Sequence, residues 1–195
     1  MKVSILSEAG YTEAALGFSL SYNTTIERAK FLLPKYAFKQ GGENKFLESM
    51  LLWVDVTAPR FWWQEADTYR VGVTKQSEST MHTICKHTLT QDDFEYIIAH
   101  EVLDKLNELV YNYSRATTPE EKVYTFGNIK NHLPEGFLQR RVWMMSYKTL
   151  QNIFYQRRHH RLPQWQHFLD NILAQIKHPE FIISERQETE KEQSE

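Results

Sequence analysis

The chain has 195 residues, a length that fits one domain of ordinary size or at most two small ones. Hydrophobic residues make up 41% of it and aromatic residues 13%, which is enough for a packed core and argues against global disorder. The 23 basic and 25 acidic residues give a net charge of −2, which disfavours a surface built throughout for nucleic acid. The single cysteine, Cys85, excludes an internal disulfide and a multi-cysteine zinc site.

Targeting and metal-binding signals are weak. The first ten residues lack the apolar run of a secretory signal, and no stretch reaches the roughly 18 apolar residues of a membrane span. His159 and His160 are adjacent, so on a helix they project in different directions and cannot chelate one ion. The sequence therefore predicts a soluble cytoplasmic protein with no membrane partner and no metal site.

The first half of the chain mixes strand and helix patterns. Strands are predicted at 2–6, 50–56 and 69–74, and helices at 11–22 and 26–39. Thr25 offers an N-cap for the second helix, and Pro34 is expected to kink or end it.

The second half is predicted to be mainly helical. The capping-box pattern of Thr90 to Asp93 predicts the start of a helix whose apolar stripe runs to Tyr113, and Thr118 with Pro119 predicts a second start. Gly127 is expected to interrupt the next connection. Residues 137–145 suit either strand or helix, and helices follow at 147–158 and from Pro163. The expected organisation is a single domain over residues 1–183 with a disordered acidic tail at 184–195.

The segment 58–82 carries an unusual density of polar groups after three consecutive aromatic residues. It includes Gln64, Asp67, Arg70 and a hydroxyl-rich turn around Ser77. Because an unpaired buried polar group costs roughly 1–3 kcal/mol, such groups must bond to one another or line a site. We interpret the segment as part of a site.

Arginines gather in two further places, Arg140-Arg141 and the run from Arg157 to Arg161. Arginine forks bind phosphate through paired charge-assisted hydrogen bonds, which would suit a nucleotide or a nucleic acid. A solvated helix face near a helix end explains the same residues equally well. The sequence alone leaves the two interpretations open.

The spacing of three segments resembles the flavin-dependent thymidylate synthases, a family that methylates dUMP using FAD, reduced pyridine nucleotide and methylenetetrahydrofolate. The family signature is R-H-R, then seven residues, then S, with a glutamine three residues before the first arginine. Here Gln64, Asp67-Thr68-Tyr69 and Ser77 reproduce that frame without a gap. The glutamine and the serine match, whereas Asp67-Thr68-Tyr69 replaces R-H-R and Ser79 replaces an arginine that usually follows the serine.

The other two segments extend the resemblance over roughly residues 40 to 177. Upstream, the family's G-H-x-S-x-x-E-H aligns with residues 42–49, where Gly42 and Glu48 match while Glu43 and Lys45 do not. Downstream, the family has a basic residue followed by L-P, which resembles Lys130 and Leu133-Pro134. The family's N-x-x-S-L-x-N-F-L-x-x-R pattern resembles the segment with Ser146, Leu150, Asn152 and Arg157 or Arg158. Its A-Q-W-E segment resembles Gln164-Trp165. One inserted residue leaves the choice between the two arginines open.

The resemblance implies two groups of binding residues and no assigned catalytic residue. The positions that imply nucleotide binding are Gln64, Ser77, Ser79, Lys130, Arg157 and Arg158. Those that imply cofactor binding are Tyr69, Arg70 and Asn152. Because Asp67 and Glu43 are acidic where the family binds flavin, we expect them to repel a flavin pyrophosphate, with Arg70 as the nearby cation that could compensate.

The resemblance implies an α+β fold with mixed helices and a small, mostly antiparallel sheet, in a homo-oligomer that would be a tetramer. It further implies a pyrimidine nucleotide such as dUMP as ligand and FAD as cofactor, with NADPH and methylenetetrahydrofolate needed only if the protein methylates dUMP. A different hypothesis is a non-catalytic protein that sequesters or senses a nucleotide on the same fold. A third is a single-stranded nucleic-acid binder that uses the arginines with Trp62, Trp63 and Trp165, which the near-neutral charge disfavours.

Overall fold

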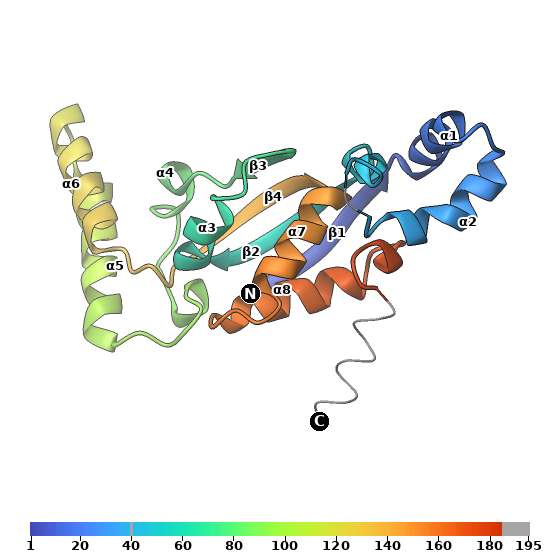
Figure 1. Ribbon diagram of the computed structural model, residues 1–195. Helices are drawn as coiled ribbons and strands as arrows, with labels where there is room; N and C mark the ends of the chain where they lie inside the picture. Colours follow the sequence, from blue (N-terminus) through green and yellow to red (C-terminus); the bar gives the residue numbers. More distant parts are fainter. Residues whose placement is uncertain (40, 185–195) are drawn as a thin grey trace, which may run out of the picture. The chain divides into compact units, whose positions relative to one another are not determined.

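The computed structural model describes residues 1–39 and 41–184. It has an α+β architecture in which the strands form a four-stranded antiparallel sheet in the order β1-β2-β4-β3, as predicted (Figure 1). The strands are β1 (Lys2–Ala9), β2 (Leu51–Pro59), β3 (Val73–Ser77) and β4 (Leu138–Ser146). The α-helices are α1 (Tyr11–Ser21), α2 (Ile26–Tyr36), α3 (Arg60–Ala66), α4 (Thr80–Thr83), α5 (His100–Arg115), α6 (Pro119–His132), α7 (Tyr147–Arg157) and α8 (Pro163–Leu173). Except for Ser184, the predicted acidic tail lies outside the described residues.

The antiparallel pairing of β2 with β4 can be followed in backbone hydrogen bonds at the two ends of the pair. The Tyr147 N–H donates to the Met50 carbonyl at 2.8 Å, and the Arg60 N–H donates to the Phe137 carbonyl at 3.1 Å. The residue number falls on one strand as it rises on the other, which is the register of an antiparallel ladder.

The chain divides into two compact units. Unit 1 contains Met1 and residues 57–67 and 76–141, and unit 2 contains residues 2–56, 68–75 and 142–195. The prediction of a single domain over residues 1–183 remains a prediction.

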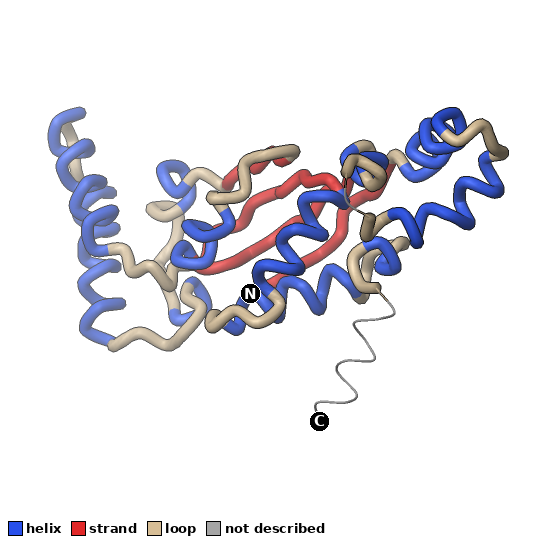
Figure 2. Tube along the Cα trace, viewed as in Figure 1, coloured by secondary structure: helices blue, strands red, loops and turns tan. Residues whose placement is uncertain are grey.

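Unit 1 contains the antiparallel helix pair α5 and α6, which packs over its own apolar cluster (Figure 2). The buried members of this cluster are Ile84, Leu89, Phe94, Leu106, Leu109, Ile129, Leu133 and Phe137. The predicted capping box at the start of α6 is present, since the Thr118 hydroxyl accepts from the Glu121 N–H and the Glu121 carboxylate accepts from the Thr118 N–H. The Thr117 N–H, the Thr118 N–H and the Thr117 hydroxyl all donate to the Glu121 carboxylate, and these bonds lower its pKa. Gly127 lies inside α6, so the expected break at that residue is wrong.

The helix expected to begin at Thr90 begins instead at His100. The capping box at Thr90 forms, but it caps only the 3-10 turn Gln91–Asp93. The Gln91 side chain then bonds to both backbone groups of Ile98, with its amide nitrogen 3.0 Å from the carbonyl and its oxygen 3.0 Å from the N–H. This side chain closes a loop where the apolar spacing predicted helix.

Unit 2 contains β1 and the helices α1, α2, α7 and α8. The α8 helix packs along β1, and α7 contacts α8, so both helices cover the sheet portion of this unit (Figure 1). Aromatic side chains fill the layer between them; Trp143 of β4 stacks on Phe168 of α8 with ring centroids 5.6 Å apart. The helices predicted at 147–158 and from Pro163 are confirmed.

The strand predicted over 69–74 is displaced, because β3 begins only at Val73. Residues 69–72 form a loop that ends at Gly72, whose backbone is left-handed with φ of 65°. The Lys75 ammonium donates to the Tyr69 carbonyl at 3.0 Å, which binds the start of the loop to β3. A bond from a lysine side chain to a loop carbonyl leaves no periodic signal in the sequence.

Two glycines of the α1 region provide a matched stability test. A Cβ on Gly10, which has φ of 94°, would lie 2.1 Å from the Ser49 carbonyl oxygen, whereas a Cβ on Gly17 inside α1 would meet open space. We expect Gly10→Ala to lower the free energy of unfolding by about 2 kcal/mol or more. Gly17→Ala should raise it by about 0.5–1 kcal/mol. Urea unfolding measures both, and equal stability of the two variants would contradict the packing at Gly10.

Candidate functional site

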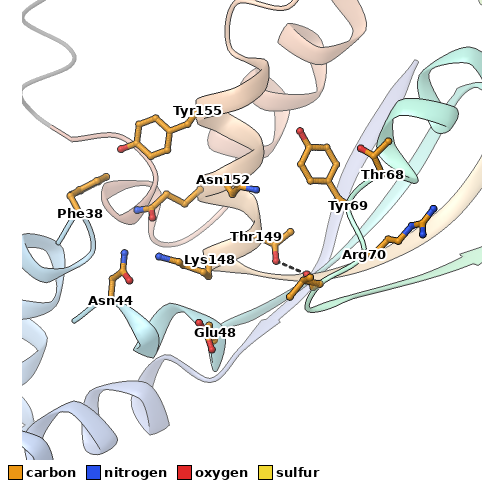
Figure 3. A pocket seen from close by; sticks show the side chains of 12 residues that line it. Phe38, Asn44, Glu48, Thr68, Tyr69, Arg70, Lys148, Thr149, Asn152 and Tyr155 are labelled. Atoms are coloured by element: carbon orange, nitrogen blue, oxygen red, sulfur yellow. Dashed lines mark hydrogen bonds between the residues drawn. The ribbon is translucent and has the colours of Figure 1, made fainter. Parts of the chain in front are cut away.

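A cavity of about 590 Å³ opens beside α7, within unit 2 (Figure 3). Its walls come from α7, the loop before β3 and the segment that precedes β2. The lining residues are Phe38, Asn44, Glu48, Thr68, Tyr69, Arg70, Val71, Lys148, Thr149, Gln151, Asn152 and Tyr155. The volume lies within the range of small-molecule and cofactor sites, which is about 300–1,000 Å³.

Three charged side chains line this cavity, and none of them forms a hydrogen bond or an ion pair with the described residues. Lys148 is half-buried, and in the part of the chain that the structure describes its ammonium has no hydrogen bond or ion pair. Arg70 and Glu48 are exposed and likewise have no such contact among the described residues. In Figure 3 the Lys148 side chain points toward Asn44, with Phe38 and Tyr155 on the same side of the cavity. A half-buried lysine at a cavity, with an ammonium that has no partner among the described residues, favours an anionic ligand.

Two buried amides, Asn44 and Gln151, form the deepest polar part of the lining, and each is 6% exposed. Gln151 Nε2 donates to the carbonyls of Ala37 and Phe181 at 3.0 and 2.8 Å. Asn44 Nδ2 donates to the same Ala37 carbonyl at 3.1 Å. The amide nitrogens therefore anchor neighbouring backbone, and the amide oxygens are left for other partners.

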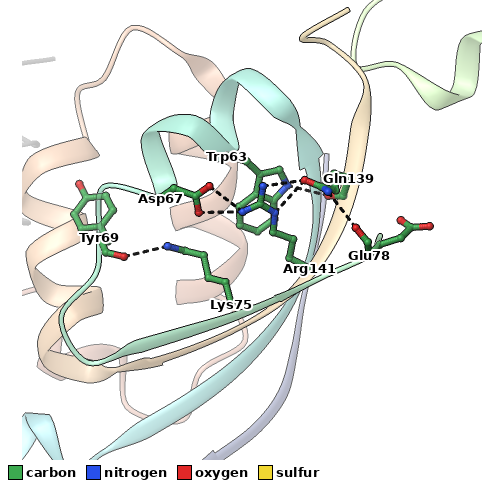
Figure 4. A network of polar contacts seen from close by, with 7 residues as sticks. All are labelled: Trp63, Asp67, Tyr69, Lys75, Glu78, Gln139 and Arg141. Atoms are coloured by element: carbon green, nitrogen blue, oxygen red, sulfur yellow. Dashed lines mark hydrogen bonds and ion pairs between the residues drawn. The ribbon is translucent and has the colours of Figure 1, made fainter. Parts of the chain in front are cut away.

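Tyr69 is held from both ends, which fixes the loop wall of the cavity. Its hydroxyl accepts from Arg157 Nε at 2.9 Å and donates to Gln156 Oε1 at 2.9 Å. Its carbonyl accepts from Lys75, as Figure 4 shows. The Arg157 guanidinium also lies over the Tyr69 and Trp165 rings, 5.6 and 4.8 Å from their centroids. Each of these contacts lies within unit 2.

The structure brings together the three residues for which cofactor binding was predicted. Tyr69, Arg70 and Asn152 all line the cavity, with Asn152 Oδ1 accepting from Gln156 Nε2 at 3.1 Å. Glu48, the matched glutamate of the upstream segment, lines the same cavity. Their binding role remains a prediction, but their common location supports it.

Four of the six predicted nucleotide-binding residues belong to unit 1. Gln64 Nε2 donates to Glu135 Oε2 at 2.9 Å, and Lys130 donates to the Thr80 hydroxyl. Partial burial and the nearby Arg60 lower the pKa of Lys130. Ser77 ends β3 and Ser79 occupies the N-cap position of α4, both exposed.

The other two, Arg157 and Arg158, belong to unit 2 and are not among the residues that line its cavity. Arg157 is bound to Tyr69, as described above. The Arg158 guanidinium lies over the rings of Phe154 and Tyr155, about 5.9 and 5.8 Å from their centroids. Both arginines therefore pack against aromatic rings, which is a common structural use of arginine.

Asp67, which stands where the family has its first signature arginine, is paired within unit 1 (Figure 4). Arg141 Nη1 lies 2.9 and 3.0 Å from its two carboxylate oxygens. Arg141 also donates to Gln139 and lies over the Trp63 ring, 4.4 Å from the centroid, while Trp63 Nε1 donates to the Gln139 carbonyl. The carboxylate that was expected to repel a pyrophosphate thus balances an arginine of its own unit.

Lys148, Gln151 and Asn44 are among the cavity residues that were not singled out from the sequence. A signal for α7 was present, because residues 148, 151, 152 and 155 follow the i, i+3, i+4, i+7 spacing of one helix face. That face is polar where an apolar stripe would be core, which marks a helix beside a cavity. Asn44 lies before β2 in an irregular segment and has no comparable signal.

Comparison with known proteins places the fold in one class. No protein-family model matches the sequence, and no curated protein matches it. Two crystal structures of the flavin-dependent thymidylate synthase ThyX from Helicobacter pylori, each containing FAD and dUMP, superpose with TM-scores of 0.70 and 0.69. Their sequences are 13% and 12% identical, and the alignments cover 94% of this chain and 98% of each of those chains. The chain therefore has a flavin-dependent thymidylate synthase-like fold.

The described residues contain neither a metal-binding cluster nor a membrane-spanning helix. Among residues 1–39 and 41–184, no group of three or more His, Cys, Asp or Glu side chains could hold a metal ion. No helix in this part of the chain is long and apolar enough to cross a membrane.

Substitution of two cavity tyrosines, Tyr69 and Tyr155, tests whether the hydrogen bonds of the Tyr69 hydroxyl stabilise the protein. Tyr69→Phe keeps the buried ring and removes a hydroxyl that bonds to Arg157 and Gln156, so we expect it to lower the free energy of unfolding by about 1 kcal/mol. Tyr155→Phe removes a hydroxyl that makes no hydrogen bond with the described residues and should change it by less than about 0.5 kcal/mol. Urea unfolding of both variants measures the difference, and a loss of equal size in both would contradict a special role for Tyr69.

Proposed function

We propose that the protein binds a pyrimidine nucleotide of the dUMP type in the cavity beside α7. The observation that carries the proposal is the half-buried Lys148 ammonium, which has no partner among the described residues and lines a cavity of nucleotide size. The fold adds support, because both similar ThyX structures contain dUMP.

The lining residues suggest how such a ligand would lie. Lys148 and Arg70 are the cations, and either can bind a phosphate through charge-assisted hydrogen bonds. Phe38 and Tyr155 offer aromatic surface for a base. Thr68 and Asn152 supply hydrogen-bonding groups for a sugar.

FAD is the cofactor that the fold implies, and when bound it would supply redox chemistry. The residues present do not match the family's way of holding it. The three signature positions hold Asp67, Thr68 and Tyr69; Asp67 is paired with Arg141, and Tyr69 is bound to Arg157. The cavity retains Arg70 as the cation of this loop. We therefore propose nucleotide binding and derive no catalytic step through a flavin, NADPH or methylenetetrahydrofolate.

A second candidate is a flavoprotein that holds FAD in the same cavity by other contacts. Tyr69, Arg70 and Asn152 lie together there, and the similar ThyX structures contain FAD. Purified protein that is yellow and releases flavin on denaturation would favour this candidate. Colourless protein that retains no flavin absorbance after it is mixed with FAD and separated from the free FAD would favour the nucleotide-binding proposal alone. The tetramer stays a prediction of the resemblance, and the cytoplasmic location stays a prediction from the sequence.

A single-stranded nucleic-acid binder is less well supported. Of the arginines that it would use, Arg141 is paired with Asp67 and Arg157 with Tyr69. Trp62, Trp63 and Trp165 are fully buried and offer no stacking surface.

Substitution of Lys148 tests the proposed function. Lys148→Met keeps an unbranched side chain of similar length and removes the charge, so we expect dUMP affinity to fall about 10- to 100-fold by calorimetry. The control is Lys122→Met on α6, an exposed lysine of unit 1, which should leave affinity unchanged. Absence of dUMP binding by the unmodified protein at millimolar concentration would overturn the proposal. Unchanged affinity in Lys148→Met would remove Lys148 from it.

A further inference from the structure

Gln151 has one polar atom left for a ligand. Its amide nitrogen donates to two backbone carbonyls, at 3.0 and 2.8 Å, so both N–H groups are used. Its Oε1 has no hydrogen-bond partner within the described residues, although the residue is 94% buried and lines the cavity. The orientation of the Gln151 amide is fixed by these bonds, because a flip would place its oxygen, which can only accept, against the carbonyl oxygens of Ala37 and Phe181.

Asn44 complements this acceptor. Its Nδ2 uses one N–H on the Ala37 carbonyl, which Gln151 also binds, so the two amides are held at one point of the backbone. The second N–H and Oδ1 of Asn44 make no hydrogen bond with any described residue. This part of the cavity therefore presents a fixed acceptor and, beside it, a donor.

We propose that Gln151 and Asn44 recognise the imide edge of a ring, the sequence carbonyl, N–H, carbonyl. The ring N–H donates to Gln151 Oε1, and an adjacent ring carbonyl accepts from Asn44 Nδ2. Uracil and the isoalloxazine of flavins share this edge. The inference rests on the proposed function, because it assumes that the cavity binds a nucleotide, and it adds which edge of the ring is recognised.

The selectivity follows from the cost of facing the Gln151 Oε1 acceptor, which the cavity exposes to a ligand, with a group that cannot donate to it. A ring that offers a lone pair opposite Gln151 would place two acceptors against each other, as the N3 of cytosine would. A methyl group on the ring nitrogen would remove the donor and fill its space. In both cases Gln151 Oε1 loses its partner, which is the situation that hydrogen-bonding sites reject most strongly.

The test varies the ligand, because replacing Gln151 would also break its bonds to Ala37 and Phe181 and destabilise the protein. Calorimetry on the full chain would compare dUMP with N3-methyl-dUMP and dCMP, and with dTMP as a control that carries its methyl group at C5. We expect dTMP to bind like dUMP. N3-methyl-dUMP and dCMP should each bind at least about tenfold more weakly.

Failures of the inference and of the proposed function are distinguishable. Equal affinity for dUMP, N3-methyl-dUMP and dCMP overturns imide recognition and leaves nucleotide binding intact. No affinity for any of the four overturns the proposed function and uracil as the source of the imide. Flavin mononucleotide and its N3-methyl derivative then form the deciding pair: a preference of about tenfold for the unmethylated flavin supports imide recognition with isoalloxazine as the source, and equal or no binding overturns it.

Discussion

The site depends on the hydrogen bonds that hold Tyr69 at both ends. Residues 68–71 line the cavity, and Gly72 ends their loop in a left-handed conformation. The loop keeps its course because Lys75 binds the Tyr69 carbonyl while Arg157 and Gln156 bind its hydroxyl. The Thr149 hydroxyl adds a bond of 3.0 Å to the Val71 carbonyl, so α7 and β3 both fix the loop. Because the loop is already fixed, a ligand that binds Arg70 and Thr68 would not have to order the loop, which would otherwise cost binding free energy.

Local contacts also explain why this segment is stable with an acidic residue at position 67 and a tyrosine at position 69. Asp67 compensates Arg141, and Tyr69 packs edge-on against the Trp165 ring while the Arg157 guanidinium lies over both rings. Asp67 and Tyr69 thus each have a structural partner, and an arginine at position 67 would face Arg141 with a like charge. Charge for a ligand has to come from elsewhere, and Lys148 and Arg70 are the cavity residues that supply it.

The sequence was sufficient where local rules decide the structure and insufficient where side chains override them. The capping box at Thr118, the helix from Pro163 and the buried strand before Pro59 follow from residues close in the chain, and all were predicted. The predicted start of α5 at Thr90 was wrong because the Gln91 side chain closes a loop by bonding to Ile98, and a periodic pattern in the sequence does not reveal such a bond. Tyr69, Arg70 and Asn152 were found through motif spacing, whereas Asn44 and Gln151 depend on bonds to Ala37, which is far from Gln151 in sequence.

Similarity of fold and similarity of site are separate properties in this chain. The sequence identity to a protein of the same fold is only 13%, and buried aromatic contacts such as the Trp143–Phe168 stack pack the core of this chain away from the cavity lining. The cavity chemistry comes from one face of α7, on which Lys148, Gln151 and Asn152 are neighbours by helical spacing. Lys148 and Gln151 lie three residues apart on α7, which is about 4.5 Å along the helix axis. A ligand that binds both, as proposed, would have to present its anionic group and its N–H edge at matching positions.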